Sequence, residues 1–209
     1  SHGGTPTPNS STNPGAYRTS EFYYGGYYGL TPAPLALSRF DDAYSRGWTG
    51  LGSLVTVADT GVDPDHVDLA DNILHMRDYT GTGIADNNGH GTHVAGIVAA
   101  LKNGAGTHGA AFDAKLAIGK VTNDQGYSFA LARDAAAWGN ELGSVAINVS
   151  AAYLRDRSLE ARLVEIGPGA AYLNHSSYGV NGYYGSRVEA LAWREALGAE
   201  QVLVKAAGN

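Results

Sequence analysis

The chain has 209 residues, of which 44% are hydrophobic and only 16% are charged, so it can fold as a large domain with a substantial core. Its formal net charge of −6 argues against nucleic acid as a partner, and the absence of cysteine excludes both a disulfide framework and a thiol nucleophile. No apolar run approaches the length of a membrane span.

The first 34 residues differ in composition from the rest. Small and polar residues dominate the beginning, and Tyr and Gly are interspersed from Tyr17 to Gly29. This composition offers little to bury, which predicts a flexible Gly/Ser/Tyr-rich arm over residues 1–34. We expect the tyrosine-rich part of the arm to pack on the surface of the domain that follows.

Residues 35–209 show helical and strand patterns in alternation. Leu37, Phe40 and Tyr44 have helical spacing and predict one short helix over residues 35–44. Later strands are predicted at 54–58, 115–121, 145–150 and 201–206, and later helices at 90–101, 128–142 and 186–197, the middle one capped by Ser128. Because short apolar strands are separated by helices, the predicted class is α/β with a parallel sheet.

The first of these strands ends at an acidic residue. Asp59-Thr-Gly follows the apolar run that ends at Ala58. Open α/β sheets place their functional sites at the carboxyl ends of strands, which makes Asp59 a candidate site residue. An Asp before a Gly is also common in a plain turn, and the pattern alone leaves both interpretations open.

The most distinctive stretch runs from Asp86 to Gly96 and is Asp-Asn-Asn-Gly-His-Gly-Thr-His-Val-Ala-Gly. Gly89 and Gly91 flank His90 without Cβ atoms, so that backbone or substrate can approach the imidazole ring closely. The small apolar residues that follow predict a tightly packed helix with His90 at its start. An imidazole held there is suited to act as a general base near neutral pH.

Two other interpretations fit the same stretch. His90 and His93 could ligate a metal ion with Asp86 as the third ligand. Alternatively, both histidines could be buried structural residues beside a turn. The stretch by itself does not decide between a general base, a metal ligand and a structural residue.

Three motifs, taken in order, resemble those of the subtilisin-like serine proteases, the subtilases. The segment Val55–Asp63 is similar to the strand that carries the catalytic aspartate of that family. Asp86–Gly96 is similar to its catalytic-histidine helix, and Ala206–Asn209 to the strand end with the oxyanion-hole asparagine. The resemblance covers most of residues 35–152 and 186–209.

The resemblance implies a fold and an activity. The fold would be a subtilisin-like parallel sheet with helices on both faces, incomplete at its C-terminal end. The activity would be that of a serine endopeptidase acting on protein or peptide substrates, without a required cofactor. Asp59 would orient His90, His90 would act as general base, and Asn209 would donate to the oxyanion. His93 would then be a structural core residue.

The family's nucleophilic serine lies in a Gly-Thr-Ser-Met-type segment, and no such segment occurs in these 209 residues. Neither Ser150 nor Ser176 has a matching context. We therefore expect the nucleophile beyond residue 209, in a remaining C-terminal segment of the same protein that also supplies neighbours for the strand at 201–206. The alternative is a truncated or nicked non-catalytic fragment that acts as a binding or assembly module.

Two departures from compact subtilisins stand out. Residues 153–185 predict a surface insertion, and this insertion and the tyrosine-rich arm resemble parts of subtilase passengers from bacterial autotransporters. That resemblance implies a secreted or cell-surface location.

Where many relatives have Ser-Leu-Gly-Gly, this chain has Ser150, Ala151 and Ala152, which would form an extended edge for the substrate.

The resemblance also implies a place for a structural calcium ion. Asp68 and the loop from Leu101 to Thr107 fall where many relatives bind one. Calcium prefers oxygen ligands, which Asn103 and the backbone carbonyls of this loop can supply.

Overall fold

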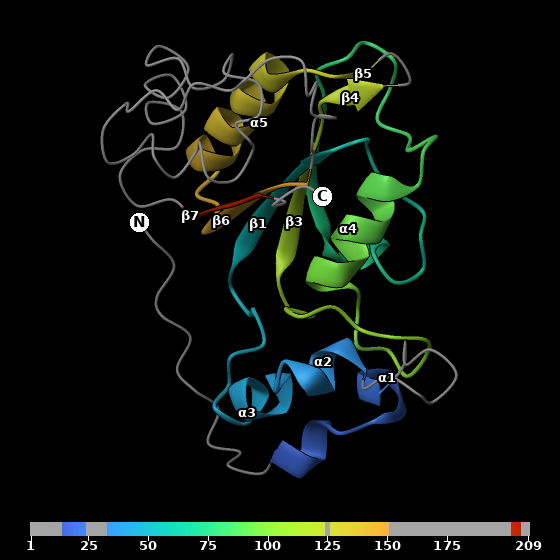
Figure 1. Cartoon of the computed structure of the whole chain (residues 1–209), viewed down its shortest axis with the longest axis vertical. Coiled ribbons are helices and arrows are strands. Elements are labelled where there is room, and N and C mark those ends of the chain that lie inside the picture. The colour runs from blue at the N-terminus through green and yellow to red at the C-terminus, as the bar shows by residue number, and fades with distance from the viewer. Residues whose placement is uncertain (1–13, 24–32, 124–125, 151–201, 206–209) are drawn as a thin grey trace, which may run out of the picture.

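The structure, a computed structural model, describes residues 14–23, 33–123, 126–150 and 202–205. Its centre is a parallel five-stranded sheet in the order β2–β3–β1–β6–β7 (Figure 1). The strands are β1 (Leu54–Asp59), β2 (Ile73–Asp78), β3 (Lys115–Lys120), β6 (Ala146–Val149) and β7 (Val202–Lys205). The predicted α/β class with a parallel sheet is confirmed.

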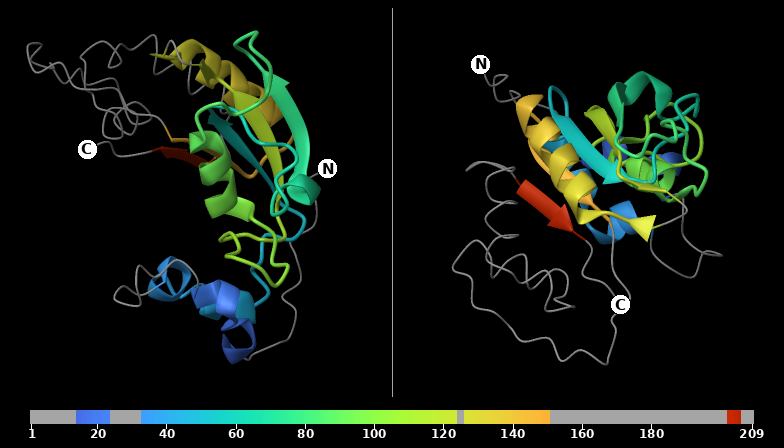
Figure 2. Two further views of the ribbon diagram at one scale, coloured as in Figure 1. Left: turned by 90° about the vertical axis from the view of Figure 1, so that its right-hand side faces the viewer. Right: turned by 90° about the horizontal axis from the view of Figure 1, so that it is seen from above.

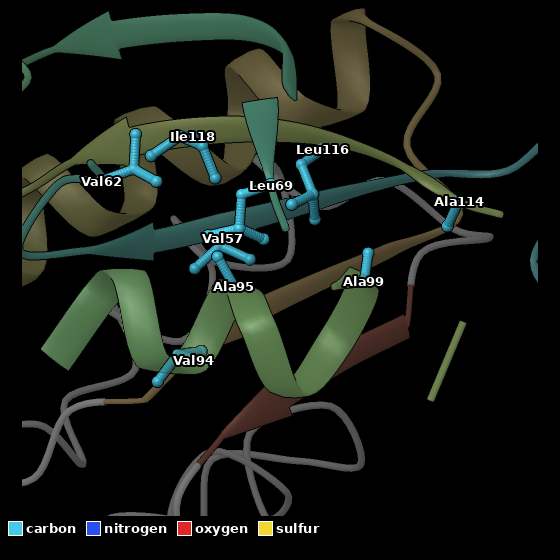
Figure 3. Packing of buried hydrophobic residues seen from close by; sticks show 9 residues of the cluster. All are labelled: Val57, Val62, Leu69, Val94, Ala95, Ala99, Ala114, Leu116 and Ile118. Carbon is cyan, nitrogen blue, oxygen red and sulfur yellow. The ribbon is translucent and has the colours of Figure 1, made fainter. Parts of the chain in front are cut away.

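Among the described residues, one helix packs on each face of this sheet. Helix α4 (His90–Ala99) covers the face to which Val57 points, and α5 (Phe129–Glu141) covers the face to which Ala58 points (Figures 1 and 2). Because successive side chains of a strand point to opposite faces, two adjacent residues of β1 serve two different cores. Figure 3 shows the α4 side, where Val94, Ala95 and Ala99 lie against the strands.

Most of the predicted elements within the described residues are confirmed. The structure contains β1, β3, β6 and β7, and both α4 and α5, near the predicted positions. Ser128 is the N-cap of α5, and its hydroxyl accepts a hydrogen bond from the backbone N–H of Leu131. The insertion at 153–185 and the helix at 186–197 lie outside the described residues.

The described part of the N-terminal arm is folded, which differs from its prediction. Residues 14–23 of the expected flexible arm form η1 (Pro14–Tyr17) and α1 (Ser20–Tyr23), and Phe22 and Glu21 are buried. The rest of the arm lies largely outside the described residues, and its boundary stays a prediction. Tyr17 and Phe22 pack in an aromatic cluster with Tyr44, which agrees with the expected docking of the tyrosine-rich part.

The single helix predicted over residues 35–44 is wrong. Two short helices, α2 (Pro34–Leu37) and α3 (Phe40–Ser45), replace it. The break lies at Arg39, whose φ of 56° is left-handed and cannot continue a right-handed helix. These helices lie with α1 near the end of the sheet where β1 begins (Figures 1 and 2).

Four further elements of the described residues have no counterpart in the sequence prediction. They are the edge strand β2, the 3-10 helix η3 (Ala70–Asn72) and the antiparallel hairpin of β4 (Thr122–Asn123) and β5 (Gly126–Tyr127). Within the described part of the chain, no helix is both long and apolar enough to span a membrane.

Candidate active site

The site lies where β1 ends and α4 begins. Asp59 is the last residue of β1, and His90 is the first residue of α4. Nδ1 of His90 and Oδ1 of Asp59 are 2.7 Å apart. Two residues that are 31 positions apart in the sequence are therefore hydrogen-bonded at the carboxyl end of a central strand.

This contact decides the roles of the two imidazole nitrogens. A carboxylate can only accept, so Nδ1 of His90 carries the proton that Asp59 binds. In the neutral ring, Nε2 then has a free lone pair and can accept a proton. The side chain of His90 is 47% exposed, whereas that of Asp59 is 3% exposed. A half-exposed base is thus oriented by a buried carboxylate.

The environment of Asp59 opposes its charge. Burial raises the pKa of Asp59, and the hydrogen bonds from His90 and from the backbone N–H of Thr60 only partly offset this effect. Oδ2 of Asp59 is buried and has no hydrogen-bond partner among the described residues. Interaction with His90 is consequently the main stabilisation that the described residues offer to this carboxylate.

The first turn of α4 is capped by side chains from outside the helix. The N-cap residue, Gly89, has a φ of 88° and no side chain to accept hydrogen bonds. The backbone N–H of Gly91 donates to Oγ1 of Thr60 at 2.8 Å, and that of Thr92 donates to Oδ2 of Asp86 at 2.8 Å. Two of the N–H groups that a helix start leaves unpaired are thereby satisfied.

Asp86 is the hub of this capping network. Its Oδ1 accepts from the Thr60 hydroxyl and from the backbone N–H groups of Asn88 and Gly89. Its Oδ2 accepts from both the N–H and the hydroxyl of Thr92. Burial raises the pKa of Asp86, but the hydrogen bonds from Thr92, Thr60 and Gly89 outweigh it and lower the value to about 2. Asp86 is therefore ionised at neutral pH.

Glycine at position 91 allows α4 to start directly against the end of β1. A Cβ on Gly91 would lie 2.3 Å from the carbonyl oxygen of Gly61 and 3.0 Å from Oγ1 of Thr60. No larger residue fits without moving the helix away from the strand. Because position 91 has no Cβ, α4 can lie close enough to the end of β1 for His90 to contact Asp59.

Lys120 connects a third element, strand β3, to the same place. It is the last residue of β3 and pairs with Asp59 in the strand register, yet it is only 3% exposed. Its Nζ donates to the carbonyl oxygen of Ala85 at 2.6 Å. This contact fixes the loop immediately before Asp86.

The sequence motifs indicate Asp59 and His90 but not Thr60, Lys120 or the capping role of Asp86. The Asp-x-x-Gly-His-Gly-Thr spacing carries a signal for the cap, because Asp and Thr favour helix starts. The hydroxyl of Thr60 comes from another part of the chain, and no local pattern reveals it.

The other predicted site residues are mostly beyond the described residues. Asn209, Ala151 and Ala152 lie outside them. Ser150 follows β6, and its Oγ is 2.8 Å from Nδ2 of Asn148. These assignments stay predictions.

The prediction that His93 is a core residue is wrong. His93 is exposed, because α4 faces the sheet with Val94, Ala95 and Ala99 and presents position 93 on its opposite side. Both oxygens of Asp86 are occupied by N–H and O–H donors. Among the described residues, no three acidic or imidazole side chains converge in a metal-binding group, so the alternative metal site loses its support.

The loop proposed for calcium receives a second carboxylate from the N-terminal segment. Oδ1 of Asp68 accepts from the side-chain amide of Asn103 at 2.8 Å. Glu21 of α1 is buried, and its carboxylate accepts from the backbone N–H groups of Asn103 and Gly104. Asp68 and Glu21 thus both bind this loop, but their contacts in the structure are to N–H donors. No three acidic or imidazole side chains of the described residues converge here, so the calcium ion stays a proposal.

Comparison with known proteins supports the same region. A model of the subtilase family matches residues 50–209, which include β1, α4 and the loop between them. A search of curated proteins finds no match to this chain.

Proposed function

The chain belongs to the subtilase family, and we propose that it forms the part of a serine endopeptidase that holds the catalytic aspartate and histidine. The hydrogen bond of 2.7 Å between His90 and Asp59 is the observation that supports this proposal best. Subtilases are serine peptidases, so the substrates of the protein are proteins or peptides.

In the proposed mechanism, Nε2 of His90 takes the proton of a serine hydroxyl as its oxygen attacks the scissile carbonyl. Asp59 keeps the proton on Nδ1 and stabilises the imidazolium that forms. His90 then returns the proton to the leaving amine. The 47% exposure of the His90 side chain is consistent with a ring that a substrate can reach.

The remaining parts of the machinery belong to the same proposal. The nucleophilic serine would come from a segment after residue 209 in the parent protein. Asn209 would donate its side-chain amide to the developing oxyanion, and removal of such a donor from subtilisin costs about 10²–10³ in kcat. Ser150, Ala151 and Ala152 would form an edge along which the peptide adds as a strand.

A structural calcium ion is proposed at the loop from Leu101 to Thr107. Oxygen atoms of Glu21, Asp68 and Asn103 would hold it, and the ion would stabilise the contact between the N-terminal segment and the domain. A secreted or cell-surface location is likewise a proposal, resting on the composition of the arm and on the resemblance to autotransporter passengers.

The decisive experiment replaces His90 by Ala in the complete protein. We expect peptide hydrolysis to fall by about 10⁴-fold or more, because the variant lacks the imidazole that takes the serine proton. His93→Ala is the matched control, since this exposed histidine lies on the same helix without contacting Asp59. Unimpaired hydrolysis by His90→Ala would show that His90 is not the general base. Absence of hydrolysis by the unaltered complete protein would instead favour the binding or assembly module.

A further inference from the structure

We propose that Asp86 is a positioning residue, which holds His90 against Asp59 by capping the first turn of α4 from outside the helix. The proposal rests on the proposed peptidase function for its kinetic consequences. Its structural part, the geometry of the His90–Asp59 hydrogen bond, is testable without catalysis.

The need for an external cap follows from the glycines. Gly89 occupies the N-cap position and offers no side chain, and Gly91 offers none either. The start of an isolated helix frays when its N–H groups are unpaired. The same first turn carries His90, so any fraying would move the imidazole away from Asp59.

Asp86 prevents this movement through two separate connections. Its Oδ2 accepts both donors of Thr92 directly, at 2.8 Å for the N–H and 2.7 Å for the hydroxyl. Its Oδ1 accepts the Thr60 hydroxyl proton at 2.8 Å, which turns the lone pairs of that oxygen towards the N–H of Gly91. Thr60 and Thr92 are thus oriented by one carboxylate.

Thr60 extends this control to the other catalytic residue. It follows Asp59 directly, and its backbone N–H donates to Oδ1 of Asp59 at 2.8 Å. That oxygen is the one that His90 contacts. The Asp86 carboxylate therefore fixes, through the hydroxyl of Thr60, the end of β1 as well as the start of α4.

The chain contains a matched carboxylate that lacks this connection. Asp78 ends β2 and accepts from the N–H and hydroxyl of Thr80 and from the N–H of Gly83. Burial raises the pKa of Asp78, but these bonds and the nearby Lys120 outweigh it and lower the value below its usual range. Both carboxylates organise a loop, but only Asp86 binds the residues around His90.

The experiment compares Asp86→Asn with Asp78→Asn in the complete protein. An amide keeps the shape but has one acceptor oxygen instead of two, so one set of N–H and O–H donors loses its partner. We expect Asp86→Asn to lower kcat about 10- to 100-fold, as misplacement of a catalytic group does, and to leave KM nearly unchanged. Asp78→Asn should lower the melting temperature and leave kcat unchanged.

A spectroscopic readout accompanies the kinetics. The proton shared by His90 and Asp59 in their short hydrogen bond resonates at low field in the proton NMR spectrum. We expect Asp86→Asn to shift or broaden this signal and Asp78→Asn to leave it in place. Because the signal does not depend on turnover, it is informative even if the complete protein hydrolyses no peptide.

A second pair of variants covers the case in which Asp86→Asn does not fold. Thr60→Val removes the hydroxyl that Asp86 orients, and Thr60→Ser retains it. We expect Thr60→Val to lower kcat and perturb the low-field signal, and Thr60→Ser to restore both. If Asp86→Asn behaves like Asp78→Asn, or if Thr60→Val leaves the signal and kcat unaltered, Asp86 stabilises only its loop and the proposal is wrong.

Discussion

The two ends of the sheet hold their key residues by different forces. At the carboxyl end of β1, His90, Asp86 and Thr60 are placed by short directional hydrogen bonds. Near the opposite end, the N-terminal helices pack around Tyr44, a fully buried aromatic residue. The hydrogen bonds hold individual side-chain atoms in place, whereas the aromatic cluster stabilises by excluding water.

The aromatic cluster illustrates how burial works without many polar contacts. The ring of Tyr44 lies 5.0 Å from that of Phe112 and 5.4 Å from that of Tyr17, and His108 and Phe40 are also in ring contact with it. Its hydroxyl donates to the carbonyl oxygen of Ala110 at 2.9 Å, and burial raises the pKa of Tyr44 above its ordinary value. One residue thereby joins α3 to the segment after α4.

This difference explains why the end of the sheet that we propose to be catalytic cannot be held together by apolar packing alone. The general base that we propose at His90 must be reached by substrate, and its side chain is 47% exposed. Apolar packing cannot orient an exposed ring, since it needs contact on all sides. Directional bonds from Asp59, and the capped helix start beneath the imidazole, replace it.

The largest effect on stability is expected at the aromatic end. Tyr44→Ala should lower the free energy of unfolding by about 3–5 kcal/mol, because a large buried ring leaves a cavity. Tyr44→Phe should cost only about 1 kcal/mol, the net contribution of its hydroxyl hydrogen bond. Urea denaturation measures both changes. Equal losses for the two variants would show that the hydroxyl, and not the ring, holds this end together.

At the carboxyl end of β1, Gly91→Ala should have a smaller effect on stability but a large one on the proposed activity. The added methyl group clashes with the carbonyl oxygen of Gly61, and such overpacking costs about 1–3 kcal/mol. Moving α4 also separates His90 from Asp59, so kcat should fall by about 100-fold. Thermal melts and steady-state kinetics test the two parts.

Gly96→Ala is the control for that variant. It lies on the same helix, where an added Cβ meets nothing within 4 Å. Alanine has the higher helix propensity, so this change should raise stability by up to about 1 kcal/mol and leave kcat unaltered. If both variants lose activity, the cause is a general effect of alanine on the dynamics of α4 and not the clash with the carbonyl oxygen of Gly61.

Sequence patterns predicted the elements that are apolar throughout or have a clear cap. The run before Asp59 forms β1, and the helix after Ser128 is α5. Strand β2 escaped prediction because Ile-Leu-His-Met-Arg-Asp mixes charges with apolar residues, as suits an edge strand that is buried on few sides. The left-handed Arg39 escaped as well, since nothing in its composition marks a non-glycine residue with positive φ.

The candidate site was predictable only where a motif is continuous. Asp59 and His90 each stand in such a motif, and the structure brings them together. The contributions of Thr60 and Lys120 depend on segments that meet only after folding. Propensity and periodicity describe neighbours along the chain and cannot report such contacts.

A change of pH should distinguish the two ends through His108. This imidazole is buried among the aromatic rings, and its Nδ1 lies 2.9 Å from the carbonyl oxygen of Gly109. Burial lowers its pKa below 6.5, outweighing the opposite effects of the Gly109 carbonyl and Glu21. The unfolded chain therefore binds a proton first, so folding stability should fall as the pH drops below about 6.5.

The measurement is the free energy of unfolding between pH 7 and pH 5. His108→Phe keeps an aromatic ring and removes the titration, so its pH dependence over this range should be flatter than that of the unaltered protein. The Asp86 carboxylate contributes nothing to this window. Its lowered pKa gives stability that is present above about pH 4 and is lost as the pH falls towards 2. Identical slopes for both proteins would rule out His108 as the acid-sensitive group.

The smallest effect is expected from calcium at the loop beside Glu21. Saturating calcium should raise the melting temperature by a few degrees over that in chelator, as ligand binding to the folded state does. Asp68→Asn removes one ligand charge and should abolish the difference. Equal melting temperatures of the unaltered protein in calcium and chelator would dismiss the proposed ion.

The central position of β1 has a consequence for how this fold tolerates change. β1 is hydrogen-bonded to β3 on one side and to β6 on the other, whereas β2 and β7 form the two edges of the sheet within the described residues. An insertion or a new partner contact at the β2 edge is separated from β1 by β3, and therefore need not disturb the strand that carries Asp59.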